Sequence, residues 1–142
     1  MAAAQSIDIA YGDTNLFVGL FATPDHPLHD RALRLFRRVA NGEVAIILTS
    51  VIASELCFVT TRVLGWSRKQ ATERLGNLLE ADGLIVHEAQ ALRLALELFG
   101  RNSRLAFADA YLAARALDAG PASIATFDRA LGSLPGIRLV EG

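Results

Sequence analysis

Short apolar runs alternate along the chain with longer segments whose apolar residues recur at helical spacing, and this alternation limits the possible folds more than any other feature. Strands that alternate with helices usually pair in parallel, because each helix returns the chain to the starting end of the sheet. The 142 residues fall within the size of one domain, and the 52% that are apolar can fill a core. We therefore expect a single α/β domain over residues 1–142, a three-layer α/β/α arrangement around a central, mostly parallel five-stranded sheet.

Glycine and proline residues mark the places where helices should end and strands begin. They lie just before four of the five expected strands, which cover 6–12, 43–48, 84–86, 122–126 and 137–140. The expected helices cover 14–21, 28–40, 51–64, 68–81, 88–100 and 105–119. Asp13, Ser50 and Ser67 are of the residue types that cap helix N-termini, and each precedes one of these helices.

Charge and cysteine content narrow the class of protein. Fifteen acidic and fourteen basic residues leave a net charge of −1, so any binding of nucleic acid must use a local basic patch. The only cysteine is Cys57, which excludes an internal disulfide and a zinc site built from cysteines, and is consistent with a reducing compartment. The first fifteen residues lack a basic leader and an apolar core, and residues 44–61 carry Glu55 and several hydroxyl side chains. We expect no membrane segment and a cytoplasmic location.

Two acidic residues follow expected strands. Asp13 comes after the first strand, in Ile-Ala-Tyr-Gly-Asp-Thr-Asn, and Asp128 comes after the fourth, in Ser-Ile-Ala-Thr-Phe-Asp-Arg. Open α/β sheets bind ligands at the carboxyl ends of their strands. A helix cap is the alternative role for each residue, since aspartate at a strand-to-helix turn commonly accepts a backbone N–H.

Two further acidic residues interrupt apolar helical segments. Glu55 is the only charged residue between Glu43 and Arg62, and its helix is otherwise rich in apolar residues. A carboxylate buried there needs a cation or several hydrogen-bond donors, and an ion pair with a neighbouring arginine is the alternative. Asp109 interrupts an apolar stripe in the same way. Its alternative role is to complement a helix dipole, which requires the helix to begin near Phe107.

The four acidic residues can meet at one edge of the sheet. If the first and fourth strands are adjacent, Asp13 and Asp128 lie side by side there, and the helices that carry Glu55 and Asp109 can converge on them. Four close carboxylates repel one another unless a divalent cation neutralises them, and a set of oxygen ligands suits Mg²⁺ or Mn²⁺. Such an ion orients and activates water and stabilises charge on a phosphoryl group. The expected reaction is hydrolysis of a phosphodiester.

These acidic motifs resemble those of a known family. The motifs are Asp-Thr-Asn at 13–15, Ser-Glu-Leu at 54–56, Phe-Ala-Asp-Ala at 107–110 and Thr-Phe-Asp at 126–128. They resemble the four acidic motifs of the PIN domain. In order, spacing and context the chain is most similar to the VapC-type toxins of type II toxin-antitoxin pairs, over essentially its whole length.

The resemblance implies a metal-dependent endoribonuclease that leaves a 5′-phosphate and a 3′-hydroxyl. It implies that Mg²⁺ or Mn²⁺ is held, directly or through water, by the catalytic residues Asp13, Glu55, Asp109 and Asp128. Thr14, Asn15 and Thr126 match polar positions that steady those carboxylates by hydrogen bonds. The chain departs from many similar toxins at Ala106, where they carry another acid, and this lowers the charge available to the metal.

The resemblance also implies two protein partners. One is a VapB-type antitoxin that covers the acidic crevice, with an arginine that competes for the carboxylates. The other is a second copy of the chain, in a homodimer formed through helices. Transfer, ribosomal and messenger RNA all remain possible targets.

Basic residues flank the acidic motifs and are candidates for contacts with RNA phosphates. They are Arg62, Arg68, Lys69, Arg101, Arg104 and Arg129. The alternative for each is a solvated position at a helix end.

Other motifs favour structural roles. His26 and His29 lie in a Pro-containing turn without a third histidine, which argues against zinc. Apolar surroundings make Cys57 more suited to packing than to nucleophilic attack, and Trp66 is more suited to packing than to base stacking. No glycine-rich nucleotide-binding motif occurs.

Other classes of α/β protein also build their sites from clustered acidic residues. A phosphoacceptor receiver needs a late lysine, whereas the only lysine is Lys69. A haloacid-dehalogenase-like phosphatase needs a second acid two positions after Asp13, where the chain has Asn15. A non-catalytic RNA-binding or protein-interaction module with a structural divalent ion remains the alternative to a nuclease.

Overall fold

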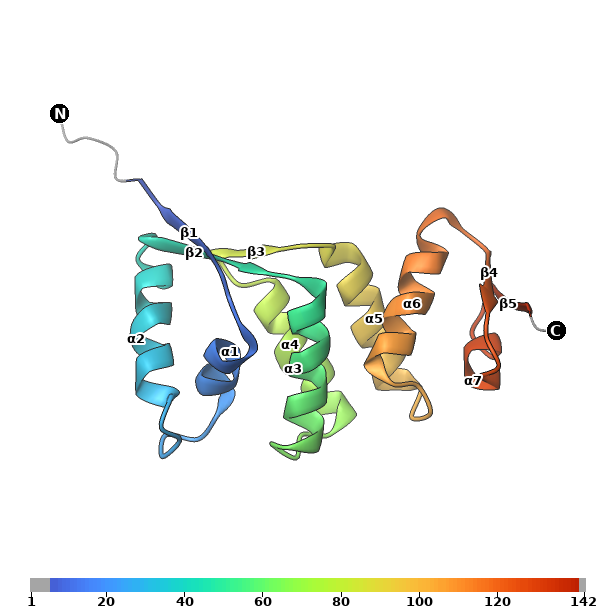
Figure 1. The fold of residues 1–142 in the computed structure, drawn as a ribbon, viewed down its shortest axis with the longest axis horizontal. Coiled ribbons are helices and arrows are strands. Elements are labelled where there is room, and N and C mark those ends of the chain that lie inside the picture. The colour runs from blue at the N-terminus through green and yellow to red at the C-terminus, as the bar shows by residue number, and fades with distance from the viewer. Residues whose placement is uncertain (1–5, 141–142) are drawn as a thin grey trace.

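The computed structural model describes residues 6–140, which form an α/β arrangement with parallel strands (Figure 1). The first half contains β1 (Asp8–Tyr11), α1 (Thr14–Phe21), α2 (His29–Ala40), β2 (Val44–Leu48), α3 (Ser50–Arg62) and α4 (Arg68–Leu79). The second half contains β3 (Leu84–Val86), α5 (Ala89–Arg101), α6 (Phe107–Ala116), a 3₁₀ turn (Leu117–Ala119), β4 (Ala122–Ala125), α7 (Arg129–Gly132) and β5 (Ile137–Val140). The mixed α/β class and the parallel strands expected from the sequence are confirmed.

Side-chain caps fix where several helices begin. The Asp13 carboxylate accepts from the backbone N–H of Leu16 at the start of α1. Ser67 and Gln70 form a reciprocal capping box at the start of α4. The cap of α3 is Thr49, so the expectation that Ser50 caps this helix was wrong by one residue. Ser50 is instead its first helical residue.

The first sheet has the order β1-β2-β3, with all strands parallel. Val44, Ile46 and Leu48 of β2 are buried and face the helices, which lie along one side of this sheet in Figure 1. The alternate positions point to the other side, where Ile9 and Tyr11 are exposed. Over residues 6–140, the second helical layer that we expected does not cover this face of the sheet.

The last two strands form a separate unit. β4 and β5 pair in parallel with each other, and together with α7 they make up what we call the C-terminal unit (Ala122–Val140). It packs on α6 through a small second core, in which Leu105 and Ala113 meet Ile124, Leu131 and Leu134. Figure 1 places this unit at the opposite end of the molecule from β1.

The strands therefore do not form the single five-stranded sheet that we expected, because β4 does not lie beside β1. The physical reason is the path of α6. This helix packs along α5, with the ring of Phe107 edge-on to that of Phe99 at 6.1 Å between centroids. The chain that follows α6 is thus carried away from β1 rather than back to it.

Within residues 6–140, no helix is both long enough and apolar enough to cross a membrane. The expectation of no targeting segment concerns, in part, residues 1–5, which lie outside the described range.

Candidate functional site

The first acidic motif lies where β1 turns into α1. Gly12 is buried at this turn, and a Cβ there would lie 2.7 Å from the Phe17 ring, so the close approach of α1 to the sheet requires glycine. The next residue, Asp13, places Oδ1 3.0 Å from the N–H of Leu16. One carboxylate oxygen of Asp13 therefore caps α1, which is the alternative role that we considered.

The second acidic motif is joined to the first by a hydrogen bond. The Thr14 hydroxyl donates to Glu55 Oε2, which links the start of α1 to the middle of α3. Thr14 was expected to steady a carboxylate in this way. Glu55 is exposed, however, and not buried as its apolar neighbours suggested. The core of α3 instead lies on the side of Ala53, Leu56 and Cys57, while its other side exposes Phe58.

The third acidic motif lies at the start of α6. The helix begins at Phe107, two residues later than expected, so Asp109 falls in its first turn and complements the helix dipole. Asp109 is half-buried. A hollow of about 350 Å³ is lined by residues of both α3 and α6. Among them are Ser54, which precedes Glu55, and Ala108, which precedes Asp109. Asp109 and Glu55 therefore belong to helices that flank one cavity.

The fourth acidic motif lies in the C-terminal unit. Asp128 caps α7 by accepting from the N–H of Ala130 at 2.9 Å, and its own N–H donates to the Thr126 hydroxyl at 2.9 Å. Asp128 is exposed. The local geometry matches the surface cap that we considered as its alternative role.

The structure thus brings together some of the predicted carboxylates and not others. Asp13 and Glu55 are linked through Thr14, whereas Asp128 lies in the C-terminal unit at the far end of the molecule (Figure 1). Over residues 6–140, no three Asp, Glu, His or Cys side chains form a group that could hold a metal. The carboxylate oxygens suit a hard divalent cation by type, but their positions in one chain do not make a complete site.

A second hollow gathers three of the six basic candidates. Arg101 and Arg104, at the end of α5 and in the loop that follows, line a hollow of about 310 Å³ together with Arg129 of α7. We call it the basic hollow. Ser103 and Ser133 add hydroxyl groups to its lining. Such a combination suits contacts with phosphate oxygens.

Arg68 has a structural role that the sequence did not reveal. Its Nη1 donates to the carbonyl oxygens of Phe99 at 3.0 Å and Leu105 at 2.6 Å, and its guanidinium lies 4.0 Å from the centre of the Phe99 ring. Arg68 therefore ties α4 to the loop between α5 and α6. Lys69 and Arg62 are exposed, and Arg62 lines the hollow between α3 and α6.

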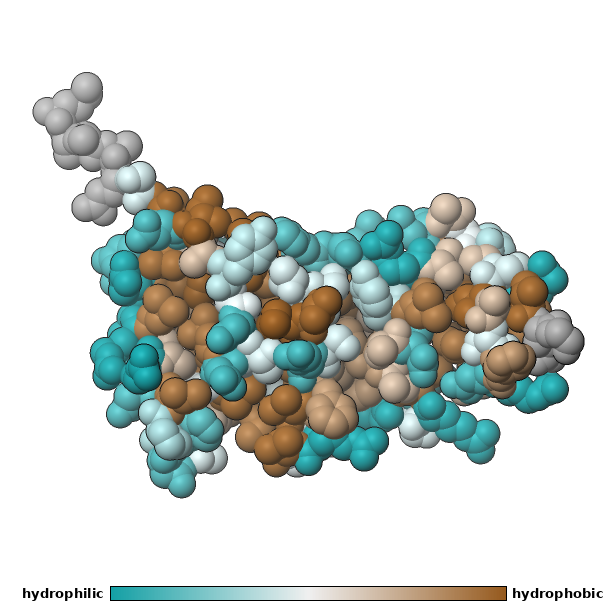
Figure 2. Space-filling view, viewed as in Figure 1, coloured by the Kyte–Doolittle hydropathy of each residue, from teal (hydrophilic) through white to brown (hydrophobic). Residues whose placement is uncertain are grey.

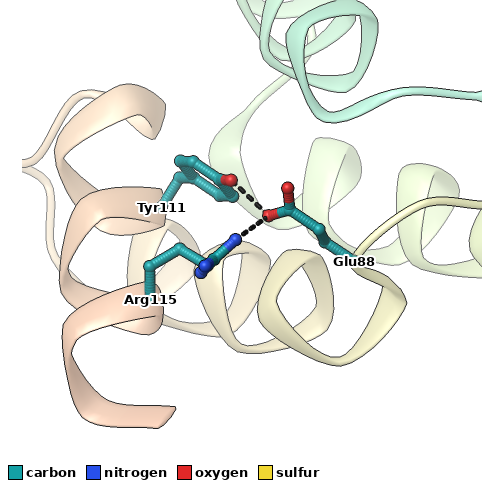
Figure 3. A network of polar contacts seen from close by, with 3 residues as sticks. All are labelled: Glu88, Tyr111 and Arg115. Carbon is teal, nitrogen blue, oxygen red and sulfur yellow. Dashed lines mark hydrogen bonds and ion pairs between the residues drawn. The ribbon is translucent and has the colours of Figure 1, made fainter.

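A polar network missed by the sequence analysis holds α6 against the start of α5 (Figure 3). The Glu88 carboxylate accepts from the Tyr111 hydroxyl and forms an ion pair with Arg115 at 2.7 Å. The hydrogen bond from Tyr111, followed by that from Arg115, lowers the pKa of Glu88 below its ordinary value of 4.5. No sequence signal marks this network, because Glu88 lies more than twenty positions before both Tyr111 and Arg115.

The residues that we set aside have structural contacts. His26 Nδ1 accepts from the N–H of Leu28 at 3.1 Å and so stabilises a local turn. His29 Nδ1 donates to the Gly19 carbonyl at 3.0 Å and so ties the start of α2 to α1. Cys57 is buried, and desolvation raises the pKa of its thiol to about 12. Such a thiol is a poor nucleophile.

One comparison with known families is decisive. The family model of the PIN domain matches residues 10–136, a span that includes all four acidic motifs. The chain belongs to the PIN domain family. No curated protein matches it closely enough to add a relative.

Membership of the PIN family sets the general function. PIN domains are generally nucleases, typically dependent on Mg²⁺, and act on nucleic acid. This agrees with the class of reaction that we expected from the acidic motifs. The matched span, residues 10–136, runs through the first sheet and into the C-terminal unit.

Proposed function

We propose that this PIN protein is a metal-dependent endoribonuclease and the toxin of a toxin-antitoxin pair. The observation that supports it most is the order of its four acidic motifs inside the matched span, with the first two linked by the Thr14–Glu55 hydrogen bond. We further propose that residues 1–142 are one domain. Its RNA substrate, VapB-type antitoxin and homodimeric state follow from the resemblance to VapC-type toxins, as does a cytoplasmic location.

The proposed catalytic residues are Asp13, Glu55, Asp109 and Asp128. When bound, a divalent cation supplies an activated water and neutralises charge on the attacked phosphate. Around it, Thr14 would fix the orientation of Glu55, and Thr126 would fix the turn that carries Asp128. Asn15 is exposed beside Asp13 and lines the same hollow of about 340 Å³ on α1 and α2. We propose that these three residues position carboxylates and do not transfer protons themselves.

Substrate binding would use the basic residues around these acids. Arg101, Arg104 and Arg129 line one hollow, which supports a shared contact with the RNA backbone. Arg62 and Lys69 are exposed and available for further contacts with phosphates. Arg68 donates to carbonyls at the end of α5 and in the loop that follows, and we propose that it supports this loop more than it contacts RNA.

The test is cleavage of RNA by the purified full chain with and without Mg²⁺. The proposal predicts that the wild type cleaves RNA and that EDTA abolishes this cleavage. The Asp13→Asn and Glu55→Gln variants should each lose the activity. The matched control Glu73→Gln, which changes an exposed acid on α4, should keep it. Circular dichroism checks that each variant is folded. Folded wild-type protein that binds RNA and Mg²⁺ without cutting would instead support the non-catalytic module. Sequencing of the RNA ends made in cells, beside an Asp109→Ala control, would identify the target.

The toxin role has its own test. Expression of the wild-type chain should arrest growth, and the Asp13→Asn variant should not. A short gene beside that of this protein, encoding a DNA-binding antitoxin, should relieve the arrest. Equal growth of cells that express the wild type and cells that express the Asp13→Asn variant would contradict the toxin role. The nuclease activity would still be decided by the cleavage assay.

A further inference from the structure

The free edge of β1 presents backbone groups ready for another strand. The N–H of Asp8 donates to the Glu43 carbonyl of the β2 side at 3.1 Å, and that of Gly12 donates to Ile47 at 2.9 Å. Because successive residues of a strand direct their N–H and C=O groups to opposite sides, those of Ile9 and Tyr11 point away from β2. No described strand lies on that side.

The outer edge of β4 is open in the same way. The N–H of Ala122 donates to the Gly136 carbonyl at 2.8 Å and that of Thr126 donates to Val140 at 3.3 Å, so both face β5. The intervening Ser123 directs its backbone groups away from β5, as does Ala125. Each open strand is four residues long, and each belongs to a parallel sheet. The two edges are therefore matched in length and in type.

Apolar side chains accompany both edges. Ile9 is 63% exposed and Tyr11 is 71% exposed on β1, and Phe127, just after β4, is 90% exposed. Figure 2 shows hydrophobic surface both around β1 and on the C-terminal unit. An open strand edge with exposed apolar side chains favours pairing with another strand.

Contacts within the chain hold these two edges apart. α6 is tied to α5 at one end by Arg68 and the Phe99–Phe107 ring pair and, further along, by the contacts of Glu88 with Tyr111 and Arg115. The C-terminal unit is in turn fixed to α6 by the second core. Bringing β4 to β1 of the same chain would separate the C-terminal unit from α6 and break the contacts of the second core.

We propose that a second copy of this chain supplies the missing strand: β4 of one copy pairs in parallel with β1 of the other, and the exchange is reciprocal. Each copy then completes a continuous sheet of order β3-β2-β1-β4-β5, whose last two strands come from its partner. A reciprocal exchange closes into a dimer and leaves neither edge open.

The exchange also completes the site. Asp13 follows the end of β1 by two residues and Asp128 follows the end of β4 by three. In a parallel pair both carboxylates reach the same edge of the sheet, so Asp128 of one copy would join Asp13 of the other. This consequence for catalysis rests on the proposed function, whereas the strand pairing does not.

Cross-linking tests the pairing without any assay of activity. An Ile9→Cys chain and a Ser123→Cys chain, co-expressed with different tags, are treated with a short bis-maleimide. The native Cys57 does not compete, because it is buried and the pKa of its thiol is raised to about 12. The proposal predicts a product that carries both tags at about twice the 15.3 kDa of one chain. The matched control, Ile9→Cys with Lys69→Cys on the exposed start of α4, should give none.

Two outcomes of this experiment would overturn the pairing. One is an absence of the doubly tagged product. The other is an intrachain cross-link in a monomeric Ile9→Cys/Ser123→Cys double variant, which would show that the C-terminal unit folds back onto β1 of its own chain. A sedimentation experiment that gives the mass of one chain at every protein concentration would also contradict the proposed dimer.

Proline substitutions separate edge pairing from folding. Ile9→Pro removes an N–H that faces the open edge, and Ser123→Pro removes its counterpart on β4. Each should weaken dimer formation at least tenfold in sedimentation while circular dichroism shows a folded chain. Ala10→Pro, which removes an N–H on the β2 side, should instead lower the stability of the chain. Unchanged dimerisation in both folded edge variants would contradict the proposal.

Complementation tests the shared site. Asp13→Asn and Asp128→Asn chains, each inactive alone, should regain roughly a quarter of the wild-type RNA cleavage when mixed in equal amounts. About half of the dimers then contain one chain of each kind, and one of the two sites in each such dimer receives both native carboxylates. No recovery, with an active wild type, would count against the shared site. An inactive wild type would count against the proposed function and leave the cross-linking result standing.

Discussion

The Thr14 hydroxyl donates a hydrogen bond to Glu55 Oε2, across 41 positions of sequence. This contact holds the carboxylate of α3 beside the turn that carries Asp13. Two of the four motif acids are thereby placed near each other by a residue that is not itself acidic.

Replacement of Thr14 by valine should therefore lower RNA cleavage about 10- to 100-fold, the range found when groups that orient metal ligands are removed. The free energy of unfolding should fall by only about 0.5–1.5 kcal/mol, as for one hydrogen bond. Cleavage assays and urea titrations measure the two effects. Thr14→Ser should restore cleavage because it keeps the hydroxyl, and Thr23→Val, which removes a hydroxyl that donates to Asp25 on the α1–α2 loop, should leave it unchanged. If the Thr14→Val variant cleaves RNA as fast as the wild type, Thr14 does not position Glu55 for catalysis.

Arg68 should matter for stability more than for RNA affinity. Arg68→Met removes a charged donor from the carbonyls of Phe99 and Leu105, and should lower the free energy of unfolding by about 2 kcal/mol in urea titrations. The neighbouring Lys69→Met is the control and should change stability by less than about 0.5 kcal/mol. If Arg68→Met leaves stability intact and weakens only RNA binding, its structural assignment is wrong.

The basic hollow should contribute to RNA binding through charge. Arg101→Gln and Arg104→Gln should each weaken RNA binding and reduce the slope of log K against log salt by about 1. Filter binding of the catalytically inactive Asp13→Asn chain, at several salt concentrations, measures this slope without cleavage. Arg37→Gln on the exposed side of α2 is the control. If the salt-dependence slopes of both variants equal that of the Arg37→Gln control, the basic hollow does not contact the RNA.

The α5–α6 contact should depend on pH. The Tyr111 and Arg115 hydrogen bonds lower the pKa of Glu88, so its charged form stabilises the folded state. This contribution is fully present above pH 4.5, the ordinary value for glutamate, and is lost as the pH falls through the lower folded-state value. The stability difference between wild type and Glu88→Gln, from urea titrations between neutral pH and about pH 3, should shrink on acidification. A stability difference between wild type and Glu88→Gln that stays constant with pH would contradict this role of Glu88. The Glu73→Gln variant is the control.

Local structure could be predicted from the sequence because glycine, proline and capping residues mark the ends of its elements. The strands Leu84–Val86 and Ile137–Val140 and the helix Thr14–Phe21 have the expected bounds. Helix α6 begins later than expected, because the N–H of Leu105 is used in a turn onto the Asn102 carbonyl.

The arrangement of these elements could not be predicted in the same way. Apolar periodicity does not reveal which strands are neighbours, so the separation of β4 from β1 was missed. Glu55 is exposed although its neighbours are apolar, since α3 also exposes Val51 and Phe58. The long-range contacts of Arg68 and Glu88 decide where α6 lies, and neither has a local signal. The candidate acids were found by their motifs, whereas their spatial relation depends on these contacts.

Binding of Mn²⁺ to the full-length protein, measured by isothermal titration calorimetry, tests most directly whether the four acids form one site. Wild type should bind the ion, and Asp13→Asn and Asp128→Asn should each weaken binding by about tenfold or more, since each removes a ligand charge. Glu73→Gln should bind as wild type does. Equal affinity in wild type and Asp128→Asn would show that the C-terminal unit supplies no ligand, and would contradict the account.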